Sequence, residues 1–94
     1  MAWIHVRHSV ADYEKWKPVF DETAEYKRNH GWKRYYAFTV EGNRNDVMVM
    51  EEFDTREHAR AFLDSTYLRE AMARAGVSGT PEILVVDEVD EGTS

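Results

Sequence analysis

The sequence predicts an α+β domain, and three observations lead to this fold class. Four short segments have the alternation or the β-branched and aromatic content of strands: Trp3 to His8, Trp32 to Val40, Val47 to Phe53 and Ile83 to Val86. Two intervening segments have a helical apolar period instead. A turn cluster at residues 42–45 joins the second strand to the third as a hairpin. The resulting order, β-α-β-β-α-β, is that of a ferredoxin-like, four-stranded antiparallel sheet with its helices on one face.

The first strand and the first helix follow from apolar spacing. Alternation gives the strand one core face, with Trp3, His5 and Arg7 on the other face. In the helical segment, apolar residues recur at intervals of three and four. Pro18 has no N–H and crowds the preceding turn, so we expect a short first turn and a main helix restarting near Pro18. His30-Gly31 is expected to end it.

The second helical segment is expected in two pieces. Asp54 is the predicted N-cap, with Glu57 three residues later as in a capping box. Ser65 is expected to cap a second piece after a break, and Gly76 to end that piece in the left-handed conformation. Residues 77–81 are then expected to form a loop before the last strand.

Length and composition restrict the class of protein. Ninety-four residues make one domain, residues 1–94, with an acidic tail at 90–94. With no cysteine, disulfides and thiolate metal sites are excluded. A net charge of −6 argues against a nucleic-acid partner, and Lys27-Arg28 and Lys33-Arg34 are interpreted as solvated surface. No apolar run reaches the length of a membrane span and no signal peptide is recognisable, so we expect a cytoplasmic protein without a membrane partner.

The face of the sheet away from the helices also needs cover. Trp3 and Phe53 are expected on this face, where exposure costs roughly 25 cal/mol per Å² of apolar surface. A second copy of the sheet is the natural cover. We therefore expect a homodimer whose sheets face each other.

These patterns resemble a known family along nearly the whole chain. The residues that carry the resemblance are Asp12 to Asp21, Gly31, Met48 to Thr55, Ala59 to Leu63, Ser65, and Leu68 to Gly76. They look like the dimeric α/β-barrel superfamily, and within it small antibiotic-biosynthesis-monooxygenase-like proteins. The resemblance implies a face-to-face dimer with a ligand cavity between sheet and helices in each subunit. Members include cofactor-independent oxygenases of aromatic polyketides, haem-degrading monooxygenases, polyketide cyclases and small-lactone isomerases, so the fold alone does not select a reaction.

No cofactor is expected. The haem-degrading branch relies on a first-strand Asn, a Trp at the end of the third strand and a His in the last helical segment. This chain has His5 or Arg7, Phe53 and Met72 at the corresponding positions, and none of them matches. A metal site is not expected either, because His5 and His8, three residues apart on a strand, point to opposite faces.

The candidate site combines residues expected on one face of the sheet: His5, Arg7, Glu51, Phe53 and either Tyr35 or Tyr36. His5 is the expected general base and Arg7 the group that holds an enolate or carboxylate, while Tyr36 and Phe53 stack on a planar ligand and Glu51 completes the ligand-binding set. An alternative interpretation is structural, with Arg7 and Glu51 paired at the dimer interface.

Two residues of the last helical segment are expected to line the cavity, Tyr67 and Met72, although a core role is common for such residues. The predicted function is a cofactor-independent monooxygenase-like enzyme that acts on a small planar or enolisable compound. Two alternatives stay open. One is a cyclase or isomerase of the same superfamily, and the other is a non-catalytic small-molecule-binding or dimeric interaction protein.

Overall fold

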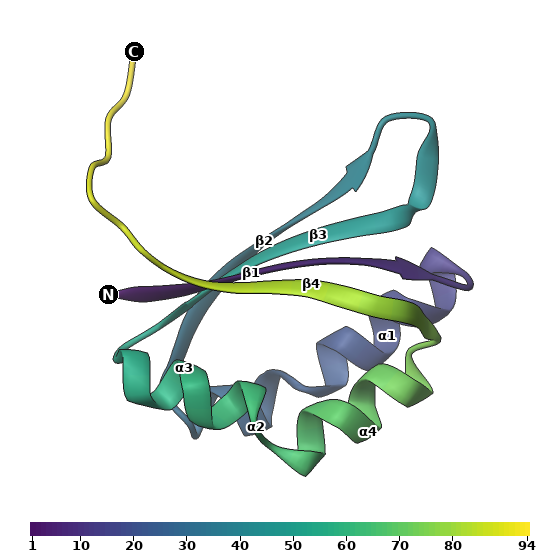
Figure 1. Cartoon of the computed structure of the whole chain (residues 1–94), viewed down its shortest axis with the longest axis horizontal. Helices are drawn as coiled ribbons and strands as arrows, with labels where there is room; N and C mark the ends of the chain where they lie inside the picture. The colour runs from purple at the N-terminus through teal and green to yellow at the C-terminus, as the bar shows by residue number, and fades with distance from the viewer.

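The computed structural model describes all 94 residues. Its elements, in chain order, are β1 (Ala2–Val10), α1 (Tyr13–Glu22), α2 (Ala24–Arg28), β2 (Trp32–Val40), β3 (Asn43–Phe53), α3 (Arg56–Leu63), α4 (Thr66–Arg74) and β4 (Val77–Asp87). The four strands form one antiparallel sheet in the order β2-β3-β1-β4, and all the helices cover the same face of it (Figure 1). The predicted ferredoxin-like α+β fold is therefore confirmed. None of the helices has the length and the apolar character that a membrane-spanning segment requires.

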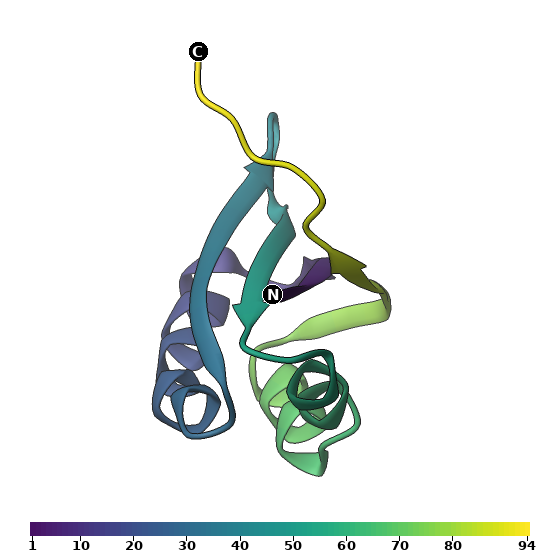
Figure 2. The same cartoon turned by 90° about the vertical axis from the view of Figure 1, so that its left-hand side faces the viewer.

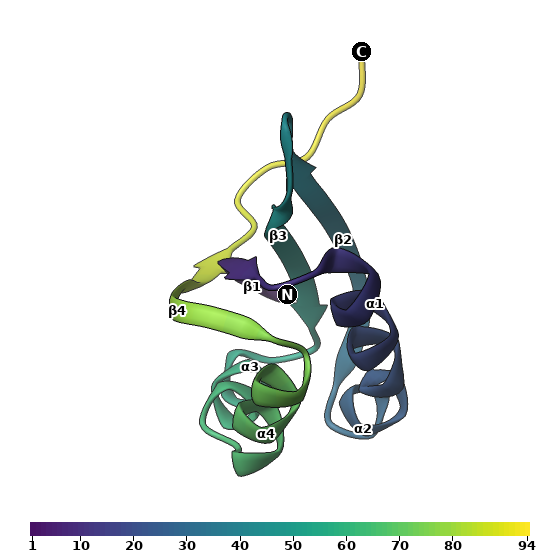
Figure 3. The same ribbon diagram turned by 90° about the vertical axis from the view of Figure 1, so that its right-hand side faces the viewer.

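The helices form two rows beneath the sheet. Figures 2 and 3 show α1 and α2 in one row and α3 and α4 in the other, with the sheet curving over both. The first row contacts β2 and β3, whereas the second contacts mainly β1 and β4. The chain after β4 has no regular secondary structure and runs away from the helices (Figure 1).

The register between β1 and β3 decides which side chains share a face. Ile4 lies opposite Glu51 and Ala2 lies opposite Phe53, whereas His5 lies opposite Met50. Because directly opposed residues point to the same face, Glu51 and Phe53 belong to the helix-covered face. The prediction that they share a face with His5 and Arg7 is wrong. The actual register is offset by one residue from the matched pleat that we assumed, and one residue of offset exchanges the two faces.

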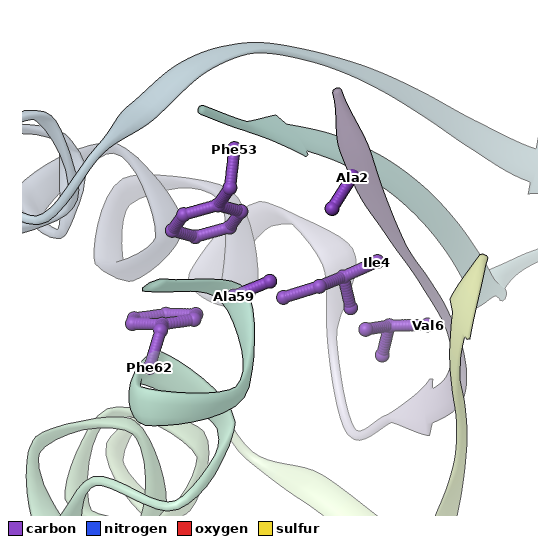
Figure 4. Close-up of a cluster of buried hydrophobic side chains, with 6 residues drawn as sticks. All are labelled: Ala2, Ile4, Val6, Phe53, Ala59 and Phe62. Atoms are coloured by element: carbon purple, nitrogen blue, oxygen red, sulfur yellow. The ribbon is translucent and has the colours of Figure 1, made fainter. Parts of the chain in front are cut away.

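The hydrophobic core has two clusters on the helix-covered face. The first, drawn in Figure 4, contains Ala2, Ile4, Val6, Phe53, Ala59 and Phe62. The rings of Phe53 and Phe62 lie 5.5 Å apart between centroids, which joins the end of β3 to α3. The second cluster contains Val10, Trp16, Val47, Val49 and Ala75. Phe53 is fully buried in the first cluster, so it does not lie on the open face as expected.

The first helix continues through Pro18 instead of restarting there. Asp12 caps its N-terminus by accepting a hydrogen bond from the backbone N–H of Glu14. The break comes later, at Thr23, whose hydroxyl donates to the carbonyl of Phe20 across 2.6 Å. Pro18 costs one backbone hydrogen bond, and the apolar face that α1 packs on the sheet outweighs this loss.

The caps of the second helical pair are partly as predicted. Thr55 caps α3 by accepting from the backbone N–H of His58, whereas Asp54, the predicted cap, contacts the ring Nδ1 of His58 at 2.6 Å. Ser65 caps α4 as predicted, by accepting from the N–H of Leu68. Gly76 follows α4 in the left-handed region, with φ of 77°.

The last strand is longer than expected. It begins at Val77 rather than Ile83, so the segment predicted as a loop is part of β4. The pairing with β1 shifts register between Arg7 and Ser9, which accommodates the irregular part of β4. Pro81 is tolerated because β4 is an edge strand, where a missing N–H costs no hydrogen bond to a further strand.

Candidate functional site

A cavity lies between the two rows of helices and the covered face of the sheet. It is narrow: the cavity volume is about 50 Å³, and the 540 Å³ of empty space around it includes open solvent at its mouth. Sixteen residues line it and twelve of them are hydrophobic. The four others are His8, Thr23, Lys27 and Glu51. A mainly apolar cavity with a few convergent polar groups is typical of a small-molecule site.

At one end of the cavity, Lys27 forms a buried ion pair with Glu51. Lys27 lies in the last turn of α2 and Glu51 lies on β3, with Nζ 2.7 Å from Oε1. Their side chains are only 2% and 7% exposed. Burial lowers the pKa of Lys27, and the neighbouring carboxylate of Glu51 opposes this shift. The two opposite charges compensate each other, which makes their joint burial tolerable.

Two aromatic rings surround the ammonium group of Lys27. Nζ lies 3.9 Å from the ring centroid of Phe20 and 4.6 Å from that of Trp32. Both contacts are within cation–π range. The amine is therefore held in place by one carboxylate and two ring faces.

On the opposite side of the cavity lies His8, on β1. The residue is only 8% exposed, and neither ring nitrogen has a hydrogen-bond partner in the protein. Its ring meets that of Trp16 edge to face, at 5.9 Å between centroids. Burial lowers the pKa of His8, with Asp46 acting in the opposite direction. Near neutral pH the imidazole is therefore uncharged, with one nitrogen free to accept and one N–H free to donate.

The register gives the distance between these two polar ends. His8 lies opposite Val47, and Glu51 is four residues further along β3. At about 3.3 Å per residue, the two levels are roughly 13 Å apart along the strand. Val6 and Val49 line the space between them from the sheet. The cavity is thus apolar in its middle and polar at both ends, which suits a small apolar molecule with a hydroxyl or carbonyl group.

Of the seven predicted site residues, Glu51 and Met72 line this cavity. His5 and Arg7 lie on the open face of the sheet. Arg7 pairs there with Asp46, through bonds of 3.1 and 2.9 Å, and not with Glu51 as the structural alternative proposed. His5 and Arg7 are therefore separated from the cavity by the sheet itself.

The remaining predicted residues have other contacts. Tyr36 lies on the open face, where its ring stacks on Trp3 at 6.0 Å between centroids. Tyr67 does not line the cavity, because its ring stacks on that of Tyr26 at 3.7 Å. Phe53 belongs to the core, as described above.

Sequence reasoning missed His8 and Lys27 as cavity residues, and interpreted Lys27 as surface. A signal for Lys27 was present. Trp16, Phe20 and Thr23 follow one another at intervals of four and three, and Lys27 comes four residues later on the same stripe. The strand alternation through Val47 and Val49 likewise carries Glu51 to the inner face. The sequence therefore places one charged residue on each of two apolar stripes that face each other. This pattern predicts a buried ion pair.

No family model matches the sequence, and no curated protein is similar enough to match it. Solved structures do match. SnoaB, a cofactor-independent oxygenase from Streptomyces nogalater, has a TM-score of 0.79 at 15% identity, over 96% of this chain and 94% of its own. An antibiotic biosynthesis monooxygenase has a TM-score of 0.72 at 14% identity, over 96% of this chain and 100% of its own. A candidate antibiotic biosynthesis monooxygenase from Caulobacter crescentus has a TM-score of 0.73 at 21% identity, over 95% of this chain and 90% of its own.

Identities this low show a shared fold and leave the activity open. The likeness spans nearly the full length of both chains in each case. The chain therefore has the ferredoxin-like fold of the antibiotic biosynthesis monooxygenase structures that it matches, as the resemblance predicted.

Proposed function

We propose that the chain is a cofactor-independent monooxygenase-like enzyme that acts on a small planar or enolisable compound in the cavity between sheet and helices. The observation that supports this most strongly is His8, a buried imidazole without a protein partner that borders an apolar cavity. A buried ring nitrogen without a hydrogen-bond partner costs about 1–3 kcal/mol, and a ligand hydroxyl or enol supplies the missing partner. The name of SnoaB describes the same kind of chemistry on the same fold.

In the proposed reaction, His8 replaces His5 as the general base. The neutral imidazole takes the proton from a phenol or enolisable C–H group, and the resulting anion supplies the electrons that reduce O₂. One oxygen atom becomes a new carbonyl group and the other leaves as water, so that a CH₂ unit and O₂ give C=O and H₂O. Glu51 and Met72 remain ligand-binding residues of this proposal, at the far end and on the helix side of the cavity.

The test is oxygen uptake with a panel of small hydroxylated naphthalenes, beginning with 1-naphthol, for which one O₂ gives the quinone and water. General base catalysis contributes about 10²–10⁴-fold, so His8→Phe is expected to lose at least about a hundredfold in rate. His5→Phe is the matched control and is expected to retain the rate. Equal uptake by His8→Phe and the unmodified protein, or no uptake with any compound, would contradict the proposal. Product formation without oxygen uptake would favour the cyclase or isomerase alternative.

The proposal includes a homodimer formed through the open face of the sheet. Tyr36, Phe38 and Leu84 are about half exposed there, at 49%, 52% and 51%. Covering them with a second sheet removes this apolar surface from water. His5 and Arg7 lie on the same face, so in this arrangement they serve the interface rather than the cavity. A cytoplasmic location is also part of the proposal, and cell fractionation tests it.

The exposed apolar face also favours the second candidate, a dimeric interaction protein without catalysis. In that case association depends on polar pairs of the open face, such as Arg7 with Asp46. Arg7→Ala is then expected to give monomers. If the dimer of the enzyme is instead held by the apolar residues of the open face, Arg7→Ala is expected to remain a dimer. Oxygen uptake and oligomeric state, measured on the same Arg7→Ala sample, separate the two candidates.

A further inference from the structure

Lys27 is a buried primary amine in an apolar cavity, and the proposed oxygenation makes no use of it. Its side chain is 2% exposed and its nearest polar partner is the carboxylate of Glu51. Hydrophobic cavity walls are the surroundings in which lysine acts as a nucleophile in proteins, because desolvation favours the neutral amine. We propose that Lys27 forms an imine with a small apolar aldehyde or ketone that enters the cavity. This chemistry shares the cavity with the proposed function and does not depend on oxygenation.

The contact with Glu51 provides a route to the neutral amine. At 2.7 Å between Nζ and Oε1, one proton can pass from the ammonium to the carboxylate. The transfer converts two buried charges into two neutral groups and leaves the net charge of the pair unchanged. Burial disfavours the charged ammonium and lowers the pKa of Lys27, which favours release of its proton. The rings of Phe20 and Trp32 act in the opposite direction, because their faces favour the ammonium.

The reaction is balanced within the pair and the ligand. The lone pair of Nζ attacks the carbonyl carbon, the C–N bond forms, and the carbonyl oxygen takes the proton held by Glu51. Nζ then returns a proton to Glu51, which passes it to the hydroxyl group of the carbinolamine. The C–O bond breaks, water leaves and the C=N bond forms. One lysine ammonium and one carbonyl compound thus give one protonated imine and one water, and Glu51 is again a carboxylate beside a cation.

The other amines of the chain serve as internal controls. Lys15 and Lys33 are exposed, and Lys17 is bound to Asp21, a contact that raises its pKa. Exposed lysines, with a pKa near 10.4, are almost entirely protonated at neutral pH and react slowly with aldehydes. The α-amino group of Met1 is also an exposed primary amine, and its labelling reports that the reagents work.

The experiment is reductive trapping on the unmodified protein, with benzaldehyde as the probe, near neutral pH and without oxygen. Sodium cyanoborohydride converts an imine into a stable secondary amine, and peptide mapping by mass spectrometry locates it. The expected result is labelling of Lys27 about tenfold or more above each of Lys15, Lys17 and Lys33, because burial lowers the pKa of Lys27 and favours its neutral amine. Labelling confined to Met1 and the exposed lysines would overturn the proposal.

Two variants test the role of the pair. Lys27→Arg keeps a cation beside Glu51 but has no primary amine, so internal labelling is expected to vanish while labelling of Met1 is retained. Glu51→Gln removes the proton acceptor, and labelling of Lys27 is expected to slow about tenfold or more. An unchanged rate in Glu51→Gln would contradict the mechanism. If a variant fails to fold, the mapping of labelled lysines in the unmodified protein still decides. The labelling is done without oxygen, so a negative result for Lys27 does not affect the oxygen-uptake test of His8.

Discussion

At the scale of single residues, the ion pair between Lys27 and Glu51 is the most deeply buried ion pair of the protein. Both side chains are almost completely buried, so removal of one partner leaves an uncompensated charge in apolar surroundings. The rest of the chain has mainly exposed pairs, such as Lys17 with Asp21, whose net contribution is small. Stability should therefore respond very differently to the loss of these two lysines.

We predict that Lys27→Met lowers the free energy of unfolding by about 3–5 kcal/mol, because Glu51 is left buried without a cation. Lys17→Met is the matched control and is expected to cost less than about 1 kcal/mol. Urea denaturation followed by circular dichroism measures both. Similar losses in the two variants would mean that the buried pair has no special role in stability.

The buried imidazole of His8 predicts that the free energy of unfolding depends on pH. Burial lowers the pKa of His8 below its ordinary value, so between the folded and unfolded pKa values the unfolded chain binds more protons at this residue. The free energy of unfolding is therefore expected to fall as the pH decreases below about 6.5, by at most about 1.4 kcal/mol per pH unit. His8→Phe removes this contribution, so between about pH 7.5 and 5.5 the unmodified protein should lose more stability than the variant.

The paired carboxylates of Asp46 and Asp54 affect stability in a different, lower pH range. Arg7 lowers the pKa of Asp46 and His58 lowers that of Asp54, so these groups lose their stabilising effect only below their ordinary pKa of about 3.8. Parallel pH profiles of the unmodified protein and His8→Phe above that range would contradict a buried neutral imidazole at residue 8.

The sequence predicted individual site residues only in part, and the reason is the register. Alternation showed that Glu51 and Phe53 share one face of their strand and that His5 and Arg7 share one face of theirs. Whether the two pairs share a face of the sheet depends on the register between β1 and β3, and an offset of one residue reverses the answer. The register is set by turn geometry and by core packing elsewhere in the chain. Lys27 was missed because a lysine was taken as surface by type, although its stripe pointed inward.

At the scale of elements, glycines with positive φ set the connections. Gly31 has φ of 95° and Gly42 has φ of 84°. A Cβ at Gly42 would meet nothing nearby, whereas a Cβ at Gly31 would collide with the side chains of Asp54 and His58. The Gly31 loop is thus held against the end of β3, where the carbonyl of Gly31 also accepts from the N–H of Asp54 at 2.8 Å.

We predict that Gly42→Ala costs about 1–2 kcal/mol from backbone strain alone. Gly31→Ala should cost clearly more, because the collision with the Asp54–His58 pair adds to the same strain. Thermal unfolding compares the two variants. The combination of Gly31→Ala with Asp54→Ala should recover part of the difference, and equal costs for the two single variants would show that the contact is relaxed without penalty.

Element types and several boundaries could be predicted from the sequence. Residues 32–40 were placed as a strand with the observed ends, and the break before Ser65 was predicted correctly, because local apolar spacing and capping chemistry determine both. The helix through Pro18 and the early start of β4 were not predicted. Both depend on pairing and packing with distant parts of the chain, which override local preferences.

At the scale of the whole molecule, the sheet has one covered face and one open face. The fold was predictable because the order of strands and helices admits few arrangements. The activity was not, since proteins of this fold differ in chemistry and the cavity's polar groups come from positions that register and packing select. The exposed apolar residues of the open face are the clearest indication of an assembly larger than one chain.

We predict that Leu84→Glu shifts the protein from dimer to monomer, because a carboxylate placed between the facing sheets would be buried without a partner. Arg69→Glu, on an exposed position of α4, is the control and is expected to leave the dimer intact. Size-exclusion chromatography with light scattering measures the mass directly. A monomeric unmodified protein at micromolar concentration would contradict the proposed assembly.

The central claim is that ligands bind in the cavity bordered by His8 and not on the face that carries His5. The most direct test is NMR of the imidazole resonances during titration with 1-naphthol, with each signal assigned by its His→Phe variant. The account predicts saturable shifts of the His8 resonances while those of His5 stay unchanged. Shifts of His5 without any change in His8 would contradict it and return the site to the open face of the sheet.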